Sequence, residues 1–445
     1  MNYTLISGSY SEIVADSLRL LPNKFTPREL FFPAIPKKAT VAIGMRRAGK
    51  SYLLYQKITE LIRSGINPNA ILLVNFEDDR LNGMDGRQLR ELINEYFKMF
   101  PQYRTENCVF MFDEIHVVEG WQKVIRTVLD QEMAQVYLSG SSAKMLSTEI
   151  ATSLRGRSLA VEVFPFSFSE HLLHSGIHQS DMVFSKADVR SRIQNELRKY
   201  LAQGGFPEVA NLEPGIAREI LQSYVDTVIL RDVVERHKIT SINALRQMAL
   251  QILRNPSSLM SINKLHGDMR SRGIAVSKDT LYAISAHLED AYLFQSIGIN
   301  SSSERVRQTN PRKIYPIDTG LSIAYSRISD RDIGKILETA TFLCLRRICK
   351  NIDYYRTEEG YEVDFILGGN NFEDLLIQSC AQMDAPETRS RELRALVSGM
   401  REKKQVSAWI VSLEHEEVFK VPEGTIFIVP AWKFFLDPKG ILGVD

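Results

Sequence analysis

The sequence predicts an α/β protein whose first part is a parallel sheet covered by helices, and two observations carry this prediction. Apolar runs of strand length recur at 40–43, 70–76, 108–112 and 134–138. Runs that are apolar throughout are typical of strands buried on both faces, as in parallel sheets. Segments with helical spacing of apolar residues, 52–63 and 122–129, alternate with these runs, as the fold class requires.

The bulk composition narrows the class of protein. A length of 445 residues exceeds one ordinary core, so we expect two or three domains. The net charge of +1 excludes a strongly basic nucleic-acid coat but not a local basic face. The 4 cysteines lack C-x-x-C spacing, which argues against a zinc site or a disulfide framework. Because we find neither a signal pattern nor a membrane-spanning stretch, we expect a cytoplasmic protein with no membrane partner.

The first apolar run ends in a glycine-rich loop. The pattern G-x-x-x-x-G-K-[ST] is met by Gly44, Gly49, Lys50 and Ser51. In this motif the loop N–H groups and the helix N-terminus hold phosphates, the lysine reaches the β- and γ-phosphates, and the hydroxyl binds Mg²⁺. An ordinary glycine turn is the alternative. The expected nucleotide-binding residues are Gly44, Arg46, Arg47, Ala48, Gly49, Lys50, Ser51 and Tyr52.

The run 108–112 ends in two acids, Asp113 and Glu114. In a nucleotide triphosphatase, Asp113 would hold Mg²⁺ through its water shell, and Glu114 would orient the attacking water. Paired acids at a strand end, taken alone, are usually solvated side chains. Their position downstream of a phosphate loop favours the catalytic interpretation.

Further catalytic candidates follow the run 134–138. This strand ends in Ser139-Gly140-Ser141-Ser142, and a hydroxyl there, Ser141 in particular, could sense the γ-phosphate through the attacking water. A helix cap is the alternative. Arg155 and Arg157 flank a glycine, so either could act as an arginine finger, in cis or towards a neighbouring chain of a homo-oligomer. The alternative is a pair of solvated arginines.

Together these motifs resemble the prokaryotic AAA-type ATPases that carry a C-terminal domain of unknown function, a family similar to archaeal ATPases. The resemblance spans nearly the whole chain and rests on segments 44–51, 112–115, 138–142, 154–157 and 204–207, the last reading Gly-Gly-Phe-Pro. It implies the P-loop NTPase fold with a helical lid, and ATP as the nucleotide. It also implies that one strand separates the acid strand from the phosphate-loop strand.

The sequence pattern of residues 239–318 predicts a winged-helix module. Three short helices, the last beginning near Ser277, precede two strands expected at 292–297 and 313–318. Between Ile239 and Leu288 the local charge excess is +4, from Arg246, Arg254, Lys264, Arg270, Arg272 and Lys278 against Asp268 and Asp279. This asymmetry favours a recognition helix that enters the major groove of DNA. A packing module or protein contact is the alternative.

Residues 319–445 resemble the restriction-endonuclease-like core that ends the chains of this family. The expected order is a helix from Glu338 followed by strands at 353–357, 361–367 and 374–380. An active core of that type needs two acids and a lysine around Mg²⁺. Glu338 and Asp364 are present, but Gln378 stands in place of the second acid and Cys380 in place of the lysine. We therefore expect a binding or scaffold fold without nuclease activity.

The expected organisation is an AAA-type ATPase core (1–175), a helical lid (176–238), the winged-helix module (239–318) and the nuclease-like domain (319–445). The expected function is that of a Mg²⁺-dependent, ATP-hydrolysing molecular switch that acts on DNA through the winged helix. A small-molecule kinase would use the same loop, but the acceptor-binding lid of a kinase is not evident. The other alternative is a nucleotide-organised protein-interaction scaffold with negligible hydrolysis.

Overall fold

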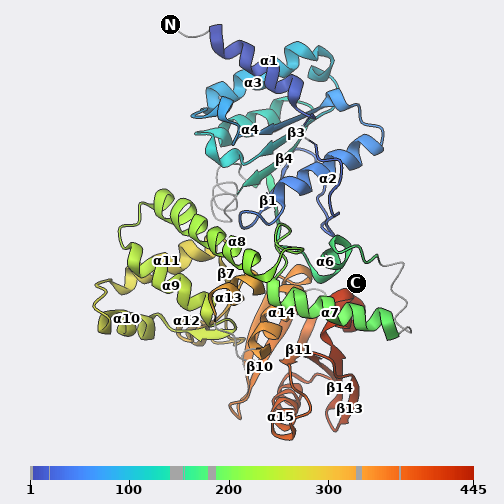
Figure 1. The fold of residues 1–445 in the computed structure, drawn as a ribbon, viewed down its shortest axis with the longest axis vertical. Coiled ribbons are helices and arrows are strands. Elements are labelled where there is room, and N and C mark those ends of the chain that lie inside the picture. Colours follow the sequence, from blue (N-terminus) through green and yellow to red (C-terminus); the bar gives the residue numbers. More distant parts are fainter. Residues whose placement is uncertain are drawn as a thin grey trace. The chain divides into compact units, whose positions relative to one another are not determined.

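The chain forms two compact units in a computed structural model (Figure 1). The structure describes residues 4–19, 21–140, 154, 156–178, 187–326, 333–369 and 372–444. The first unit comprises residues 1–164 and 290–292, and the second comprises residues 165–289 and 293–445.

The first unit is built on a five-stranded parallel sheet in the order β2-β3-β4-β1-β5. Its strands are β1 (Ala39–Ile43), β2 (Ile71–Asn75), β3 (Cys108–Asp113), β4 (Ala134–Gly140) and β5 (Ser158–Glu162). Strand β4 separates the acid strand β3 from the loop strand β1, which confirms the order that the family resemblance implied. Because the strands are parallel, the carboxyl ends of β1, β3 and β4 meet at one edge of the sheet.

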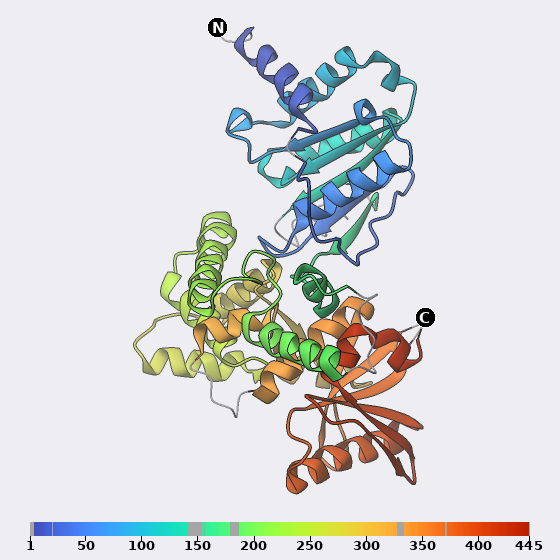
Figure 2. The ribbon, with the colours of Figure 1, turned by 45° about the vertical axis from the view of Figure 1, so that its right-hand side comes forward.

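Helices cover both faces of this sheet (Figure 2). They are α1 (Thr4–Asp16), α2 (Lys50–Arg63), α3 (Gly86–Met99) and α4 (Trp121–Gln131). On one face, Leu54 and Ile58 of α2 share a core cluster with Met111 of β3. On the other, the rings of Tyr96 and Phe97 in α3 contact Phe110. Neighbouring residues of β3 thus serve opposite faces, which explains why the strand is apolar throughout.

The second unit begins with a group of helices, two of which are linked through a buried carboxylate. These are α6 (Phe168–His174), α7 (Ala187–Gln203), α8 (Pro214–Thr227), a π-helix (Val228–Glu235) and α13 (Thr319–Tyr325), which packs against α7 and α8. Gly205, in the Gly-Gly-Phe-Pro motif, donates its N–H to the Asp318 carboxylate at 2.6 Å. Burial raises the pKa of Asp318 to about 6, even though three backbone N–H groups lower it. The motif therefore holds the end of α7 to the start of α13.

The middle of the second unit follows the order helix, strand, helix, helix, strand, helix, strand. Its elements are α9 (Ile242–Arg254), β6 (Ser258–Met260), α10 (Ile262–Ser271), α11 (Lys278–Asp290), β7 (Phe294–Ile297), α12 (Glu304–Thr309) and β8 (Arg312–Pro316). The strands form an antiparallel sheet in the order β6-β8-β7. As expected, Ser277 caps α11, its hydroxyl accepting the N–H of Thr280 at 3.0 Å. The short helix α12 lies where we expected only a polar loop.

The last part of the second unit is a six-stranded mixed sheet in the order β13-β14-β12-β11-β10-β9. Its elements are α14 (Ile333–Ile348), β9 (Asn351–Arg356), β10 (Glu362–Gly369), β11 (Phe372–Cys380), α15 (Pro386–Lys403), β12 (Ser407–Ser412), β13 (Glu417–Val421), β14 (Gly424–Pro430), α16 (Ala431–Leu436) and α17 (Pro438–Leu442). Phe342 of α14 stacks near Phe365 of β10, whereas Leu396 of α15 packs with Ile366. The two helices therefore contact alternate residues of β10. Within the described ranges, we find no helix long and apolar enough to cross a bilayer.

Asp318 should make the stability of the second unit depend on pH. Its pKa in the folded state is about 6 against an ordinary 3.8, so the folded chain binds this proton more readily than the unfolded chain between those values. The stabilisation of the folded state by protonated Asp318 is complete below about pH 4 and is lost as the pH rises to 6. The stability of wild type relative to Asp318→Asn, measured by denaturant unfolding from pH 4 to pH 7, should therefore fall over that range.

The exposed acid of α11 supplies the control. Asp279→Asn should leave the pH dependence of unfolding as it is in the wild type. An equal pH dependence in Asp318→Asn and wild type would contradict the prediction.

Candidate functional site

The glycine-rich loop joins β1 to α2 at the carboxyl edge of the first sheet. Gly44 lies so close to the end of β5 that a Cβ atom would stand 2.2 Å from the carbonyl oxygen of Val163. Gly49, at φ +96°, adopts the left-handed conformation immediately before α2 begins at Lys50. Both positions therefore require glycine, and the first N–H groups of α2 are available to an anion.

Lys50 and Glu114 form a buried ion pair at this edge. The Lys50 Nζ lies 3.5 Å from Glu114 Oε1 and donates a hydrogen bond to the Met45 carbonyl at 3.2 Å. The two residues are only 4% and 8% exposed. Burial raises the pKa of Glu114, but the charges of Lys50, His116 and Arg46 outweigh it and hold this pKa below its ordinary value. Glu114 is thus a carboxylate at neutral pH.

Asp113 lies beside this pair and near the hydroxyl of Ser51, which lowers its pKa. Burial, together with the charge of Glu114, outweighs this and raises the pKa of Asp113 to about 6. A hydroxyl and a carboxylate are oxygen donors of the kind that Mg²⁺ takes in nucleotide sites. The two expected metal ligands therefore meet, and their chemistry fits the ion.

Ser139 is a site residue that the sequence reasoning did not select. Its hydroxyl accepts the N–H of Glu114 at 2.9 Å and donates to the carboxylate of Asp113. Glu114 stands at φ +52° and ψ +39°, a strained left-handed conformation for a non-glycine residue. One hydroxyl on β4 thus fixes both acids. The available signal was its place at the end of the strand beside β3, where the sequence reasoning chose Ser141 instead.

The other expected loop residues differ in their surroundings. Arg46 forms an ion pair with Glu77 at 3.0 Å. Arg47 is exposed and, at φ +66°, also stands in the left-handed region. Ala48 is buried, and Tyr52 is exposed at the start of α2. These four residues lie on the loop or directly after it.

Arg157 does not join this site within the chain. It directly precedes β5, whose first residue Ser158 pairs with Ala39 at the amino end of β1. The loop leaves the opposite, carboxyl end of β1, and Arg157 forms an ion pair with Asp130 of α4. This placement argues against Arg157 as an arginine finger for the site of its own chain. A role towards a neighbouring chain stays a prediction. Three other candidates, Ser141, Ser142 and Arg155, lie outside the described residues.

A second cluster of charges lies in the second unit. The Nζ of Lys313, on β8, stands 2.7 Å from Glu338, 2.9 Å from Glu362 and 2.9 Å from Asp364. Lys313 is 4% exposed. Burial lowers its pKa, but Asp364 and Glu338 outweigh burial and raise this pKa well above the ordinary value. Burial and the charge of Asp364 raise the pKa of Glu338 to about 8. At neutral pH Glu338 therefore keeps its proton, and the Lys313 ammonium faces the carboxylates of Asp364 and Glu362.

Lys313 therefore lies beside Glu338 and Asp364, the two acids that the sequence pattern assigned to a nuclease-like site. The sequence showed Cys380 where a lysine was expected, but the structure brings Lys313 from a different strand to the acids. Gln378 donates to Glu392 at 2.6 Å and accepts the N–H of Asp364 at 3.0 Å, so both ends of its amide are used. In the described parts of the chain, no group of three or more His, Cys, Asp or Glu side chains is arranged to hold a metal ion.

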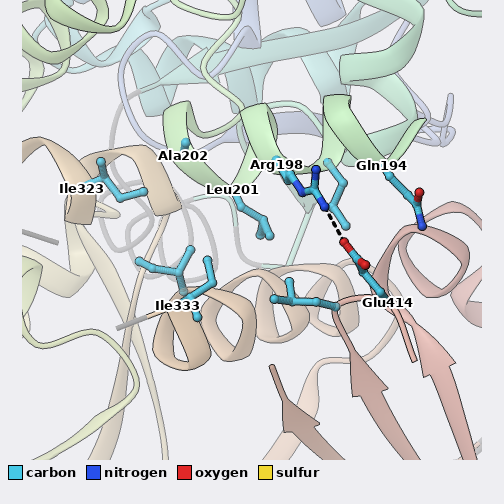
Figure 3. A pocket seen from close by; sticks show the side chains of 10 residues that line it. Gln194, Arg198, Leu201, Ala202, Ile323, Ile333 and Glu414 are labelled. Atoms are coloured by element: carbon cyan, nitrogen blue, oxygen red, sulfur yellow. Dashed lines mark hydrogen bonds and ion pairs between the residues drawn. The ribbon is translucent and has the colours of Figure 1, made fainter. Parts of the chain in front are cut away.

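A hollow of about 350 Å³ lies elsewhere in the second unit (Figure 3). Leu201, Ile323 and Ile333 contribute to its mainly apolar lining. At its side, Arg198 and Glu414 form an ion pair at 2.5 Å. Among the described residues that line it, no acid and base are set apart for catalysis, so we assign no reaction to it.

Loss of Lys313 should destabilise the second unit strongly. Lys313→Met would leave the carboxylate of Asp364, which is 7% exposed, without its counter-charge, a change that costs about 3–5 kcal/mol for a buried pair. Adding Asp364→Asn to this variant removes that charge and should restore part of the loss. Denaturant unfolding measures both effects.

The matched control is Lys335→Met, which removes an exposed lysine of α14. It should change the free energy of unfolding by less than about 0.5 kcal/mol. If Lys313→Met were as stable as this control, the cluster would not carry the stability that we assign to it.

Comparisons with known proteins agree with the geometry of the first site. Residues 36–172 match the family model described as an AAA domain, and residues 194–332 match a domain of unknown function, DUF8612. An uncharacterized protein of Methanocaldococcus jannaschii is 32% identical over 448 residues, which cover 96% of this chain and 95% of that protein. An uncharacterized protein of Haemophilus influenzae is 30% identical over 328 residues, which cover 73% and 78% of the two chains.

Three solved structures are more distant. The ORC1 protein of Aeropyrum pernix in complex with DNA has a TM-score of 0.30 at 13% identity, covering 73% of this chain and 92% of its own. Cdc6p of Pyrobaculum aerophilum has a TM-score of 0.27 at 11% identity, covering 77% of this chain and 94% of its own. AMPPCP-bound DnaA of Aquifex aeolicus has a TM-score of 0.23 at 12% identity, covering 62% of this chain and 86% of its own. Scores this low carry nothing about ligands. The AAA-domain match and the relative from Methanocaldococcus jannaschii agree with the phosphate loop. The chain therefore belongs to the archaeal-like family of AAA-type ATPases.

Proposed function

We propose that this chain binds ATP with Mg²⁺, hydrolyses it to ADP and phosphate, and works as a molecular switch. The observation that supports this most is the Lys50–Glu114 ion pair at the edge of the sheet where Ser51 and Asp113 also lie near each other. A phosphate loop alone would support binding only. The buried carboxylate beside it supports water as the acceptor.

Each side chain has a distinct role in this proposal. Lys50 exchanges Glu114 for the β- and γ-phosphates when ATP enters. Glu114, released from Lys50, orients the attacking water and takes up its proton. Ser51 and Asp113 hold Mg²⁺, which when bound offsets the charge of the phosphates. Ser139 keeps both acids in place through its two hydrogen bonds.

The switch rests on the modules that follow the ATPase core. We propose that ATP closes the helical lid, residues 176–238, on the core and that hydrolysis releases it. The winged-helix module (239–318) and the nuclease-like domain (319–445) would then change position with the nucleotide. The closed Lys313 cluster supports a nuclease-like domain that binds without cutting. In a homo-oligomer, Arg155 or Arg157 would act towards a neighbouring chain.

Phosphate release tests the hydrolysis. Lys50→Ala and Glu114→Gln should each lower kcat by about a hundredfold or more, since one loses the cation on the phosphates and the other the base. Glu114→Gln should still bind ATP. The control Lys57→Ala, on the same helix as Lys50, should keep wild-type release.

Two outcomes would redirect the proposal. Negligible release from wild type and both variants, with ATP still bound, would favour a nucleotide-organised interaction scaffold. Transfer of phosphate to a small molecule in place of water would favour a kinase.

We propose further that the winged-helix module binds duplex DNA with little sequence preference. All six bases between residues 239 and 288 are exposed, and Tyr282, near the start of α11, is 56% exposed. Neutralising phosphates with exposed Lys and Arg releases counterions, so binding of this kind weakens as salt rises. The strand pair β7–β8 beside α11 supplies the wing.

Electrophoretic mobility shift with duplex DNA across a salt series tests the module. Arg272→Ala with Lys278→Ala should weaken binding and lower the slope of log affinity against log salt by about 1.8, or about 0.9 for each lost phosphate contact. The control Lys420→Ala with Lys439→Ala removes the same charge from exposed positions near the C-terminus and should leave the slope unchanged. Absence of a shift even at low salt would refute the DNA proposal.

A further inference from the structure

Arg28 is a buried arginine that belongs to none of the motifs described above. It precedes β1, in the segment between α1 and the first strand, and is only 5% exposed. Its Nη1 donates to the carbonyl of Ala48 at 2.7 Å, and its Nη2 donates to the carbonyl of Phe164 at 2.6 Å. A charged donor shared between two buried carbonyls makes stronger hydrogen bonds than a neutral one.

The first of these bonds fixes the orientation of one peptide group in the phosphate loop. In a trans peptide the carbonyl of one residue and the N–H of the next point in opposite directions. Because Arg28 holds the Ala48 carbonyl, the N–H of Gly49 must point away from Arg28. A Cβ atom on Gly49 would stand 2.8 Å from Arg28 Nη1, so the guanidinium lies directly against the loop.

The segment that carries Arg28 is itself fastened to α2. The backbone N–H of Arg28 donates to the side chain of Gln56 at 2.7 Å, and the Gln56 amide donates back to the Arg28 carbonyl at 3.2 Å. The guanidinium is therefore placed from a helix that begins at the loop. Hydrogen bonds therefore link Arg28 both to the phosphate loop and to α2.

The second bond reaches the point where the chain leaves the first unit. Phe164 is the last residue of its long segment in that unit. The preceding residue, Val163, donates its N–H to Ile43 at 2.7 Å, and its carbonyl lies against Gly44. The start of the phosphate loop, at Gly44, thus contacts Val163 directly. Its end, at Ala48, is linked to Phe164 through Arg28.

We propose that Arg28 is a positioning residue for ATP: it directs the Gly49 N–H towards the phosphates and couples the loop to the exit at Phe164. The inference deepens the proposed ATPase function and rests on it for the identity of the nucleotide. The Gly49 N–H would contact the phosphates before and during hydrolysis alike. Loss of Arg28 should therefore weaken binding more than it slows the chemical step.

Steady-state phosphate release and titration with a fluorescent ATP analogue test this on the full chain. Arg28→Gln should raise Kd and KM for ATP about tenfold while kcat changes less than threefold. Arg28→Lys should give an intermediate rise, since an ammonium binds one carbonyl but lacks the fork that binds two. The control Arg87→Gln, which removes an exposed arginine of α3, should match wild type in all three constants.

Hydrogen exchange adds a readout of the coupling. Binding of the analogue should slow amide exchange in residues 44–50 and 163–166 of the wild type, and in Arg28→Gln only in residues 44–50. If Arg28→Gln fails to fold, Arg28→Lys carries both comparisons.

Two results would overturn the inference: Kd and KM within twofold of wild type in both variants, or a fall in kcat with KM unchanged. A wild-type chain that binds the analogue without hydrolysing ATP would refute the proposed ATPase alone. The affinities of the Arg28 variants would still decide the role of this residue.

Discussion

The burial of opposite charges at the carboxyl edge of the first sheet is the constraint on which the nucleotide site depends. Lys50 and Glu114 are both nearly inaccessible, and removing either one would take a buried counter-charge away from the other. They meet because β1 and β3 are parallel with only β4 between them. Strand β4 must end in a small polar side chain there, and Ser139 fills that place with bonds to both acids. Strand order, loop and acid pair therefore depend on one another.

The sequence predicted those parts of the fold that local patterns encode. Continuous apolar runs identified the buried strands β1 to β4, and Ser277 identified the start of α11. The helix α12 escaped prediction because its six residues rest on one cap, Ser303, and on local side-chain pairs such as Glu304 with Arg307. The π-helix Val228–Glu235 lies within residues 176–238, which we expected only to be helical.

The residues of the candidate site also differ in whether local sequence patterns predict them. Residues within the loop and at the end of β3 were predicted because their spacing is fixed by one short segment. Arg28 and Lys313 were not, since Arg28 meets Phe164 and Lys313 meets Asp364 only through the tertiary fold. Arg157 was predicted from its residue type and its place beside a glycine, and the register of β5 places it at the amino end of the strands. A residue before a parallel strand and a residue after one lie at opposite edges of the sheet.

The charge on Lys313 also bears on how the second unit can assemble. Its ammonium comes from β8 in the three-stranded sheet, whereas the acids come from α14 and β10. The counter-ion is therefore a covalent part of the chain and is present at fixed stoichiometry, whatever the salt or chelator in solution. In a fragment that begins after β8, Asp364 and Glu338 would lose this ammonium, and Glu362 would keep only its ion pair with Arg356. The middle part of the second unit thus supplies a counter-charge to the C-terminal part.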